Sequence, residues 1–357
     1  MDSKEKLKKF WNNKKVFVTG HTGFKGSWMT IMLNMLGADI FGYSLKPNKK
    51  SLFNEANCKN ILKKNFYGDI NNLNNLRKKL KATKPNILFH LAAQPLVSKS
   101  FDDPLQTFQT NIIGTANVLD SIKSAPSIKS VVIITTDKVY KIKKNNKNYD
   151  ELDELGGKDP YSASKACAEI ITNSYIESFL NRKYLKNKVS TARSGNVIGG
   201  GDYSENRLLP DIIKSINSKK KIIVRNPQSI RPWQHVIEPT LGYLRLAELQ
   251  YKKKKLHNNQ TWNFGPNQRS FVKVIDILKM IKKKFKVEFK IKKNTNFFET
   301  KILKLNSYKA KRFLNWSPNW NLQKSLDSVM EWNYKVKKNK NAKEISETQI
   351  NNYLKIK

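Results

Sequence analysis

The chain has 357 residues, 39% of them hydrophobic, enough to bury one large core or one and a half domains. Two cysteines, Cys58 and Cys167, are too few for a disulfide framework or a zinc site. No apolar run approaches the about 20 residues of a membrane span, and the charged N-terminus lacks the apolar core of a signal peptide. We therefore expect a cytoplasmic protein from a reducing compartment, with no metal site.

The balance of charge is extreme, because 68 Lys and Arg residues against 28 Asp and Glu residues give a formal net charge of +40. Such a charge is typical of proteins that bind nucleic acid or anionic surfaces. Abundant Lys, Asn and Ile equally indicate compositional drift, as AT-rich codons would produce. The lysine clusters fall in expected loops and ends and are not interleaved with aromatic residues, as a groove for single strands requires. We favour drift and expect no nucleic-acid partner; a polyanion-binding protein with a catalytically silent dinucleotide fold is the distant alternative. The clusters cover residues 141–147, 252–255, 282–284 and 335–343.

Strand-like and helix-like segments alternate through the first half of the chain. The expected strands cover residues 14–20, 38–45, 65–70, 87–92, 130–136 and 189–194. The expected helices cover residues 28–36, 73–81, 108–122 and 161–180. This alternation predicts an α/β fold with a Rossmann-type, doubly wound parallel sheet.

Past residue 196 the alternation breaks into loops rich in Gly, Pro and Arg, with regular segments returning at 236–249 and 261–265. This change predicts a second, smaller C-terminal domain for the substrate. We expect a dinucleotide-binding domain of residues 1–192 plus about 236–266, and a substrate domain of about 193–235 plus 267–357.

A glycine-rich segment lies between the first expected strand and the first expected helix. Gly20, Gly23 and Gly26 have the spacing G-x-x-G-x-x-G. The first glycine allows a tight turn, the second lets backbone approach a pyrophosphate, and the third lets the helix pack on the strand. The helix N-terminus then presents N–H donors and its positive end to the phosphates. The segment predicts a dinucleotide site, with a purely structural turn as the alternative.

The residues that should hold the adenosine are less clear. The second expected strand ends without a carboxylate for the ribose, and Lys46 could instead meet a 2′-phosphate, so the residues leave NADP open beside NAD. Asp69 is a candidate for contact with the adenine or a cap of its own loop. We interpret His90 as a hydrogen-bonded strand residue rather than a catalyst, and Asn111 as a residue that bonds backbone within its helix.

Five further residues point to hydride chemistry. Thr136, Asp137 and Lys138 follow the fifth expected strand, at the edge where open parallel sheets bind ligands, although a strand-end turn would use the same residue types. Tyr161 and Lys165 lie four residues apart on an expected helix and project from one face. A phenol titrates near about 10, and an ammonium beside it favours the phenolate, so Tyr161 can act as a base. The pair alone is a weak signal, but after a dinucleotide loop it predicts oxidation of an alcohol.

Six stretches carry a resemblance to a known family: GHTGFKGSW (20–28), HLAAQPLV (90–97), TTDKVY (135–140), GGKDPYSASKACAE (156–169), ARSGNVIGGGD (192–202) and RPWQHVIEP (231–239). Over residues 11–332 the chain resembles the extended short-chain dehydrogenases/reductases, the NAD-dependent epimerase/dehydratase family. It is similar within them to the nucleotide-sugar 4,6-dehydratases that act on CDP-glucose. Lys138 stands where the related dTDP-glucose dehydratases carry glutamate, and this lysine, with GFKGSW and RPWQHV, selects the CDP-sugar branch.

The resemblance implies a lyase with bound NAD. CDP-glucose would be oxidised at C4, lose water across C5–C6 and regain the hydride at C6, which gives CDP-4-keto-6-deoxyglucose. Tyr161 would take the C4 hydroxyl proton with support from Thr136 and Lys165, Asp137 would protonate the C6 hydroxyl, and Lys138 would be the base at C5. The resemblance also implies a homodimer formed through the helix of Tyr161. Another NAD-dependent nucleotide-sugar dehydratase, epimerase or decarboxylase is the alternative.

The expected site is larger than these catalytic groups. The cofactor-binding residues that we expect are Gly20, Thr22, Gly23, Phe24, Lys25, Gly26, Asp69, Ile70, Leu91, Ala92, Ala93, Tyr161 and Lys165. The substrate-binding residues that we expect are Gln94, Ser98, Asn196, Arg207, Arg231 and His235. Arg193 and Arg225 lie in the same basic segment, where any single arginine is more readily surface charge than a phosphate ligand.

Overall fold

A computed structural model describes residues 3–143, 147–180, 188–218, 221–252, 261–285, 287–291 and 302–355. Within these ranges, seven strands form one parallel sheet in the order β11-β6-β5-β4-β1-β2-β3. The strands are β1 (Lys15–Thr19), β2 (Asp39–Ser44), β3 (Lys64–Tyr67), β4 (Ile87–His90), β5 (Ser130–Ile134), β6 (Lys188–Ser194) and β11 (Thr261–Phe264). The predicted Rossmann-type sheet is confirmed, and its edge strand β11 comes from one of the segments expected to return to regular structure.

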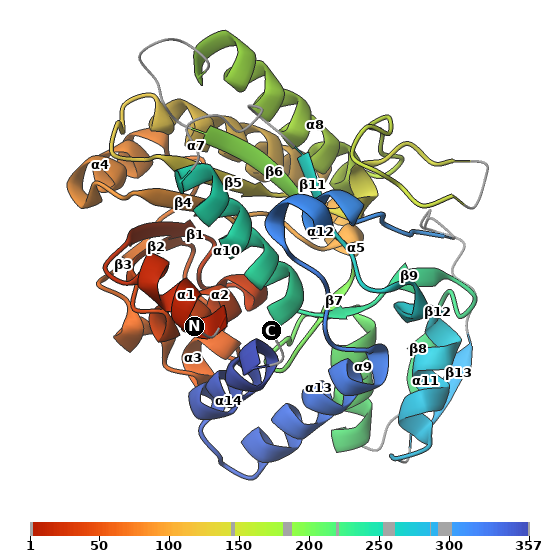
Figure 1. Cartoon of the computed structure of the whole chain (residues 1–357). Coiled ribbons are helices and arrows are strands. Elements are labelled where there is room, and N and C mark those ends of the chain that lie inside the picture. Colours follow the sequence, from red (N-terminus) through yellow and green to blue (C-terminus); the bar gives the residue numbers. More distant parts are fainter. Residues whose placement is uncertain are drawn as a thin grey trace.

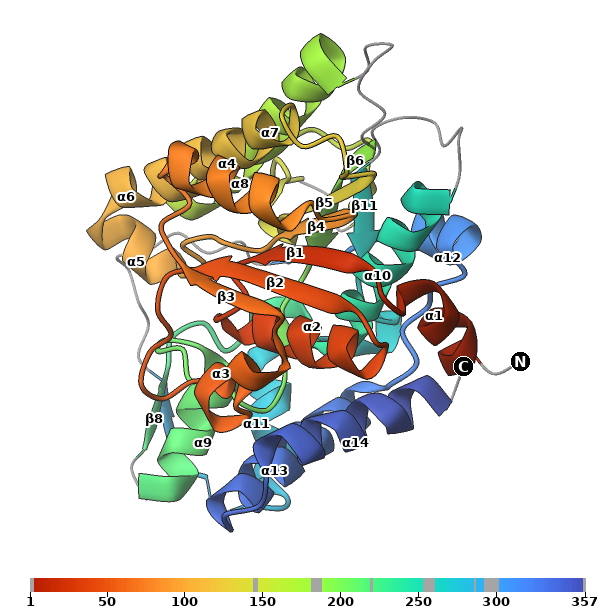
Figure 2. The same cartoon turned by 90° about the vertical axis from the view of Figure 1, so that its left-hand side faces the viewer.

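The sheet is buried on both faces, because successive side chains of a strand point to opposite sides. Val131 and Ile133 of β5 enter one apolar core, and Val132 and Ile134 enter the other. Helices cover both faces, as Figures 1 and 2 show. One face is covered by α4 (Leu73–Thr83), α7 (Gly114–Ile122) and α8 (Pro160–Tyr175), and the other by α2 (Phe24–Met35) and α10 (Ile237–Lys252).

The helix that carries Tyr161 begins with strong local signals. Asp159 caps α8 by accepting a hydrogen bond from the Ser162 amide at 2.9 Å, and Pro160 occupies the first helical position. The helical path then continues into a π-helical turn, η4 (Ile176–Leu180). The expected helix of residues 161–180 is confirmed.

The expected helix of residues 108–122 is interrupted by a change in winding. Its path runs through α6 (Pro104–Phe108), the π-helical turn η2 (Gln109–Ile113) and α7. π-Helical turns inside helices are often found at functional sites. The turn lies against α8, beside the residues that carry the expected catalytic pair.

A second lobe with its own apolar core lies beside the sheet, at the lower right of Figure 1. Ile212, Ile277 and Val329 are fully buried in this core. Its helices are α9 (Leu208–Ser218), α11 (Val274–Lys282) and α13 (Leu322–Lys337). In this lobe the short strand β8 (Ile222–Val224) pairs with β13 (Phe289–Ile291), and β9 (Ile230–Pro232) pairs with β12 (Phe271–Lys273). A third pair is formed by β7 (Val197–Ile198) and β10 (Gln234–His235).

The first and last helices of the chain lie side by side (Figures 1 and 2). Lys4 Nζ in α1 (Ser3–Trp11) donates to Asn351 Oδ1 in α14 (Ala342–Lys355) at 2.7 Å. Apolar side chains of α14 enter the core that also holds α2. The remaining helical segments are α3 (Leu52–Glu55), η1 (Cys58–Ile61), α5 (Val97–Asp102), η3 (Asp137–Val139), η5 (Gln268–Ser270) and α12 (Tyr308–Leu314).

Among the residues that the structure describes, none of the helices combines the length and apolar composition that a membrane span requires. Parts of the predicted lysine-rich loops, residues 144–146 and 253–255, lie outside the described residues.

Candidate active site

A cavity of about 750 Å³ opens at the carboxyl edge of the sheet, between the sheet and the second lobe. Its walls include residues that directly follow β1, β4, β5 and β6, together with residues of α8, α9 and β8. Open parallel sheets bind ligands at this edge. The cavity is therefore the candidate active site.

The glycine segment forms one end of the cavity. Gly20 has φ +73°, and a Cβ there would lie 2.5 Å from the Ala92 amide nitrogen, so only glycine fits this turn. A Cβ on Gly26 would lie 2.1 Å from the Gly20 carbonyl oxygen, which explains the close contact of α2 with β1. Gly23 precedes α2 and lines the cavity, and no side chain caps this helix. The uncapped N–H groups of α2 therefore face a space that suits a pyrophosphate.

Lys25 reaches from this loop toward the end of β6. Its Nζ donates to Ser194 Oγ at 3.0 Å and to the Tyr243 hydroxyl at 3.4 Å. Burial, together with the charges of Arg207 and Lys165, lowers the pKa of Lys25 to about 7. Lys25 thus carries only a partial positive charge near neutral pH, between the expected cofactor site and the expected catalytic residues.

The adenosine side of the cavity offers hydroxyl groups rather than a carboxylate from β2. Thr22 Oγ1 lies 2.8 Å from Ser44 Oγ and donates to the Leu45 carbonyl at 3.0 Å. Asp69 lines the cavity, but its Oδ1 accepts from the Asn71 amide at 2.9 Å, as a loop cap does. Lys46, the candidate for a 2′-phosphate, is exposed and does not line the cavity. The other expected cofactor residues that line it are Phe24, Ile70, Leu91, Ala92 and Ala93.

Tyr161 and Lys165 line the middle of the cavity from the first turns of α8. Burial raises the pKa of Tyr161 to about 12, against the opposing effects of a hydrogen bond with Thr136 and the charge of Arg207. Burial also lowers the pKa of Lys165 to about 8, against the opposing charge of Glu169. The predicted preference for a phenolate therefore competes with desolvation, which favours the neutral phenol.

Thr136 and Lys138 also line the cavity, and Thr136 is hydrogen-bonded to Tyr161, whereas the side chain of Asp137 does not line it. Thr136 Oγ1 donates to Asp137 Oδ1 at 3.1 Å, and Lys138 Nζ lies 3.5 Å from the same oxygen. Asp137 is fully buried beneath Gly195, where an added Cβ would lie 3.1 Å from Asp137 Oδ2 and 2.3 Å from Pro232 Cγ. Asp137 can therefore act on a ligand only through Thr136 or Lys138.

The expected substrate residues divide into two groups. Four line the cavity: Ser98, Asn196, Arg207 and Arg231. Arg207 Nη1 also donates to Asp202 Oδ2 at 3.1 Å. Gln94 and His235 do not line it. Gln94 Nε2 donates to Thr107 Oγ1 at 2.8 Å, and the His235 ring packs against Trp28 and Trp320, with centroids 5.5 and 4.9 Å away. Ala93 and Pro95 on either side of Gln94 line the cavity, and so does Trp233, two residues before His235. The side chains of Gln94 and His235 are themselves buried in the protein interior.

Asn111 follows Thr110, which lines the cavity, and its side chain makes contacts that the sequence did not predict. Its Nδ2 donates to Ser164 Oγ at 2.9 Å and to the Gln94 carbonyl at 3.1 Å, and its Oδ1 accepts from the Gln94 amide at 2.8 Å. The expectation that its side chain bonds within its own helix is wrong. Because Ser164 precedes Lys165, Asn111 joins η2 and the segment after β4 to α8, the helix of the expected catalytic pair.

The interpretation of Arg193 as surface charge is also wrong. Arg193 is 3% exposed and forms an ion pair with Glu169 of α8. Its place in β6, next to Ala192 and Ser194 in a buried strand, was the available signal in the sequence. A charged residue inside such a strand requires a buried partner.

Comparisons with known proteins agree with this geometry. The model of the family described as GDP-mannose 4,6 dehydratase matches residues 17–329. The chain is similar to the CDP-glucose 4,6-dehydratase of Salmonella typhimurium, with 38% identity over 353 residues, 97% of this chain and 98% of that protein.

Two solved structures share the fold at lower identity. A dTDP-glucose 4,6-dehydratase from Bacillus anthracis, in complex with NAD, superposes with a TM-score of 0.74 and 22% identity, covering 91% of this chain and 98% of that one. MoeE5 in complex with UDP-glucuronic acid and NAD superposes with a TM-score of 0.77 and 20% identity, covering 90% and 99%.

Proposed function

The chain belongs to the GDP-mannose 4,6 dehydratase family, and from this premise we propose that it converts CDP-glucose to CDP-4-keto-6-deoxyglucose and water. One observation carries the proposal: the predicted oxidation pair, Tyr161 and Lys165, and the predicted elimination base, Lys138, line the same cavity as the glycine loop. A protein that only oxidised an alcohol would need the first pair and the loop. Lys138 adds a base in the same cavity, which suits removal of a proton after oxidation.

The cofactor in this proposal is NAD. The uncapped N-terminus of α2, with Gly23 facing the cavity, fits a pyrophosphate, and Lys46 lies outside the cavity, which disfavours a 2′-phosphate. NAD supplies a hydride acceptor that takes the C4 hydrogen and returns it to C6. The expected cofactor residues remain our proposal for its contacts, with Asp69 placed close to the adenine end.

The chain's own residues would move the protons. Tyr161 takes the C4 hydroxyl proton as the phenolate, with Thr136 bonded to its oxygen and Lys165 beside it. Lys138 removes the C5 proton that the C4 ketone has acidified. For this step the proton shared by Lys138 and Asp137 lies on Asp137, so that Lys138 is neutral. The C6 oxygen leaves as water with that proton, which reaches it through Thr136, and the proton taken from C5 passes from Lys138 to Asp137. The hydride lost from C4 returns to C6, so the net change is the loss of one water.

Three features support CDP-glucose as the substrate. The similar Salmonella protein bears that name, and Lys138 occupies the position where dTDP-glucose dehydratases carry glutamate. Arg207 and Arg231 line the part of the cavity that faces the second lobe, and arginine suits a diphosphate because its guanidinium donates two parallel hydrogen bonds. We propose that these arginines and Asn196 bind the nucleotide diphosphate, with Ser98 near the sugar.

A homodimer and a cytoplasmic location complete the proposal. Apolar side chains are exposed over neighbouring helices on the α8 side of the molecule: Leu105 of α6, Ile113 of η2 and Ile170 of α8 are 79%, 44% and 56% exposed. A second copy that packs this surface against its own would bury them. Ile170→Glu should then halve the mass measured by light scattering, and an unchanged mass would contradict this interface.

The two-domain division follows the same scheme. We propose that residues 1–192 and about 236–266 bind NAD, since α10 and β11 of the second segment pack on the main sheet. Residues of about 193–235 and 267–357 would bind the nucleotide sugar. Helix α14 bridges this division, because it packs both on α2 of the first domain and on α13 of the second lobe.

One experiment tests the activity directly. The purified protein with NAD is incubated with CDP-, dTDP-, GDP- and UDP-hexoses, and the mass of each product is measured by mass spectrometry. We expect loss of one water and a 4-keto product from CDP-glucose. A product of unchanged mass would indicate an epimerase. Loss of carbon dioxide from a nucleotide hexuronic acid, added as a separate substrate, would indicate a decarboxylase. Salt-sensitive binding to nucleic acid that survives Tyr161→Phe, without any turnover, would support the polyanion-binding alternative.

A further inference from the structure

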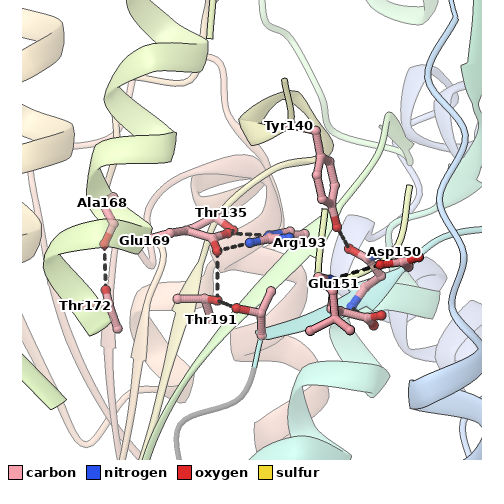
Figure 3. A network of polar contacts seen from close by, with 12 residues as sticks. Thr135, Tyr140, Asp150, Glu151, Ala168, Glu169, Thr172, Thr191 and Arg193 are labelled. Atoms are coloured by element: carbon pink, nitrogen blue, oxygen red, sulfur yellow. Dashed lines mark hydrogen bonds and ion pairs between the residues drawn. The ribbon is translucent and has the colours of Figure 1, made fainter. Parts of the chain in front are cut away.

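A buried ion pair joins α8 to β6 behind the cavity wall. Glu169, one helical turn after Lys165, accepts from Arg193 Nε at 2.7 Å and from Thr135 Oγ1 at 2.6 Å. Its second oxygen accepts from Arg193 Nη2 and from Thr191 Oγ1, as Figure 3 shows. Glu169 is 1% exposed and Arg193 3%. A bidentate pair this deeply buried fixes the separation of the two elements that carry it, because either charge alone would be left without compensation.

The face of the same guanidinium carries an aromatic ring. Arg193 Cζ lies 4.5 Å from the centroid of the Tyr140 ring, and the Tyr140 ring stacks on Tyr149 at 4.8 Å and 18°. The Tyr140 hydroxyl donates to Asn263 Oδ1 at 2.7 Å. A planar guanidinium can bind a carboxylate along its edge and a ring on its face at once, which an ammonium cannot do.

The two contacts connect the proposed catalytic groups. Tyr140 lies two residues after Lys138, and Glu169 lies four residues after Lys165. We infer that Arg193 is a positioning residue that sets where Lys138 stands relative to Tyr161. Through Glu169 it holds the catalytic helix, and through Tyr140 it holds the turn of the elimination base. This inference rests on the proposed function.

The position of Lys138 should depend on Arg193 more than the position of Tyr161 does. Tyr161 and Lys165 belong to a capped helix of 16 residues, whose backbone bonds hold them in any case. Lys138 belongs to η3, which has three residues and no helix to fix it. Loss of the ring contact should therefore displace Lys138 more than Tyr161, and slow elimination more than hydride transfer. Displacements of about 1 Å can cost about 10²-fold in rate.

Stopped-flow absorbance of NADH, with CDP-glucose and the NAD-loaded enzyme, separates the two steps. In Tyr140→Leu and in Arg193→Lys we expect NADH to form within about twofold of the wild-type rate and then to accumulate, because water is lost at least about tenfold more slowly. Tyr140→Phe is the conservative variant that keeps the ring on the guanidinium, and it should restore rapid elimination. Circular dichroism and thermal unfolding check that each variant is folded.

The outcomes are distinct. If the Tyr140→Leu and Arg193→Lys proteins fold but accumulate no NADH, the inference is overturned. Equal slowing of NADH formation and of water loss also overturns it, because that result indicates a general structural role. If Tyr140→Leu does not fold, Arg193→Lys decides, because its ammonium still pairs with Glu169 but cannot support the ring. If wild-type protein releases no water from any of the four hexoses, the proposed function fails and the inference fails with it.

Discussion

The proposed oxidation pair and the proposed elimination residues are held in the molecule by different means. Tyr161 and Lys165 lie on α8, a 16-residue helix with an aspartate cap, which packs on α7 and on the sheet. Asp137 and Lys138 lie on η3, a turn of three residues. Backbone hydrogen bonds within the helix hold the first pair. The turn of the second is anchored by the Val139 carbonyl, which accepts from the Gly156 amide at 2.7 Å, and by side-chain contacts of Thr136 and Tyr140.

This difference indicates where such a protein can change its chemistry. The helix places residues four apart on one face whatever the substrate, so oxidation is tied to the fold. A short turn can change with one or two substitutions, and the expected exchange of glutamate for lysine at position 138 would be such a change. We therefore expect variants of the helix pair to remove all activity, and variants of the turn to uncouple the two steps.

The largest effect should come from the helix. Tyr161→Phe keeps the ring but removes the proton acceptor, and general acid–base catalysis contributes about 10²–10⁴-fold. We expect turnover to fall by at least about 10³-fold, with neither NADH nor keto sugar formed. Tyr175→Phe makes the same change on the same helix away from the cavity and should behave as wild type. Near wild-type turnover by Tyr161→Phe would assign the C4 base elsewhere.

The turn should give a smaller and more selective effect. Lys138→Ala should leave hydride transfer intact and slow the loss of water by at least about 10²-fold, so NADH accumulates and exchange of the C5 hydrogen with deuterated solvent stops. Lys141→Ala, three residues later, changes an exposed lysine paired with Glu154 and serves as the control. Full dehydratase activity in Lys138→Ala would place the base on another residue.

A variant that weakens substrate binding should slow oxidation and elimination equally. Arg207→Met removes a proposed diphosphate contact, and a hydrogen bond to a charged group is worth about 1.5–3 kcal/mol, so KM for CDP-glucose should rise about 10- to 100-fold. Arg207 also opposes the rise in the pKa of Tyr161 that burial causes, so its loss should move the alkaline-dependent rise in kcat to higher pH. Arg312→Met, on α12, is the control. An unchanged KM would remove Arg207 from the diphosphate site.

The main sheet could be predicted from the sequence because its strands are buried on both faces. Continuous apolar runs such as residues 130–134 have few other structural solutions, and their alternation with helices fixes a parallel topology. The second lobe could not be predicted in the same way. Its strands have two or three residues, too few for a periodic pattern, and their partners lie as far along the chain as β8 and β13.

The site could be predicted where topology alone brings residues together. The carboxyl ends of parallel strands share one edge, so the glycine loop, Thr136 and the helix of Tyr161 had to converge there. The contacts of Asn111 and Arg193 join residues from different elements, and no local pattern reports them. Gln94 and His235 show the converse limit, since a place in a motif beside the cavity does not give the direction of a side chain.

The smallest predicted effect is the loss of stability at low pH that depends on His90, a buried residue at the end of β4. His90 Nδ1 lies 2.8 Å from Thr19 Oγ1, and its Nε2 lies 3.1 Å from Thr115 Oγ1 of α7. Burial lowers the pKa of His90 to about 3, so between about pH 6.5 and pH 3 the unfolded chain binds a proton that the folded chain does not. The free energy of unfolding must then fall as the pH falls through this window, for this residue by about 1 kcal/mol between pH 7 and about pH 5.5.

Urea unfolding of His90→Gln at these two pH values should show that this part of the acid loss has disappeared. An undiminished loss would mean that His90 is charged in the folded protein. The ratio of NADH formation to water loss should stay the same in this variant, because His90 supports the framework of α8 and not the turn. A changed ratio would mean that the framework also sets the position of Lys138, and the distinction between a helix-held and a turn-held motif would fail.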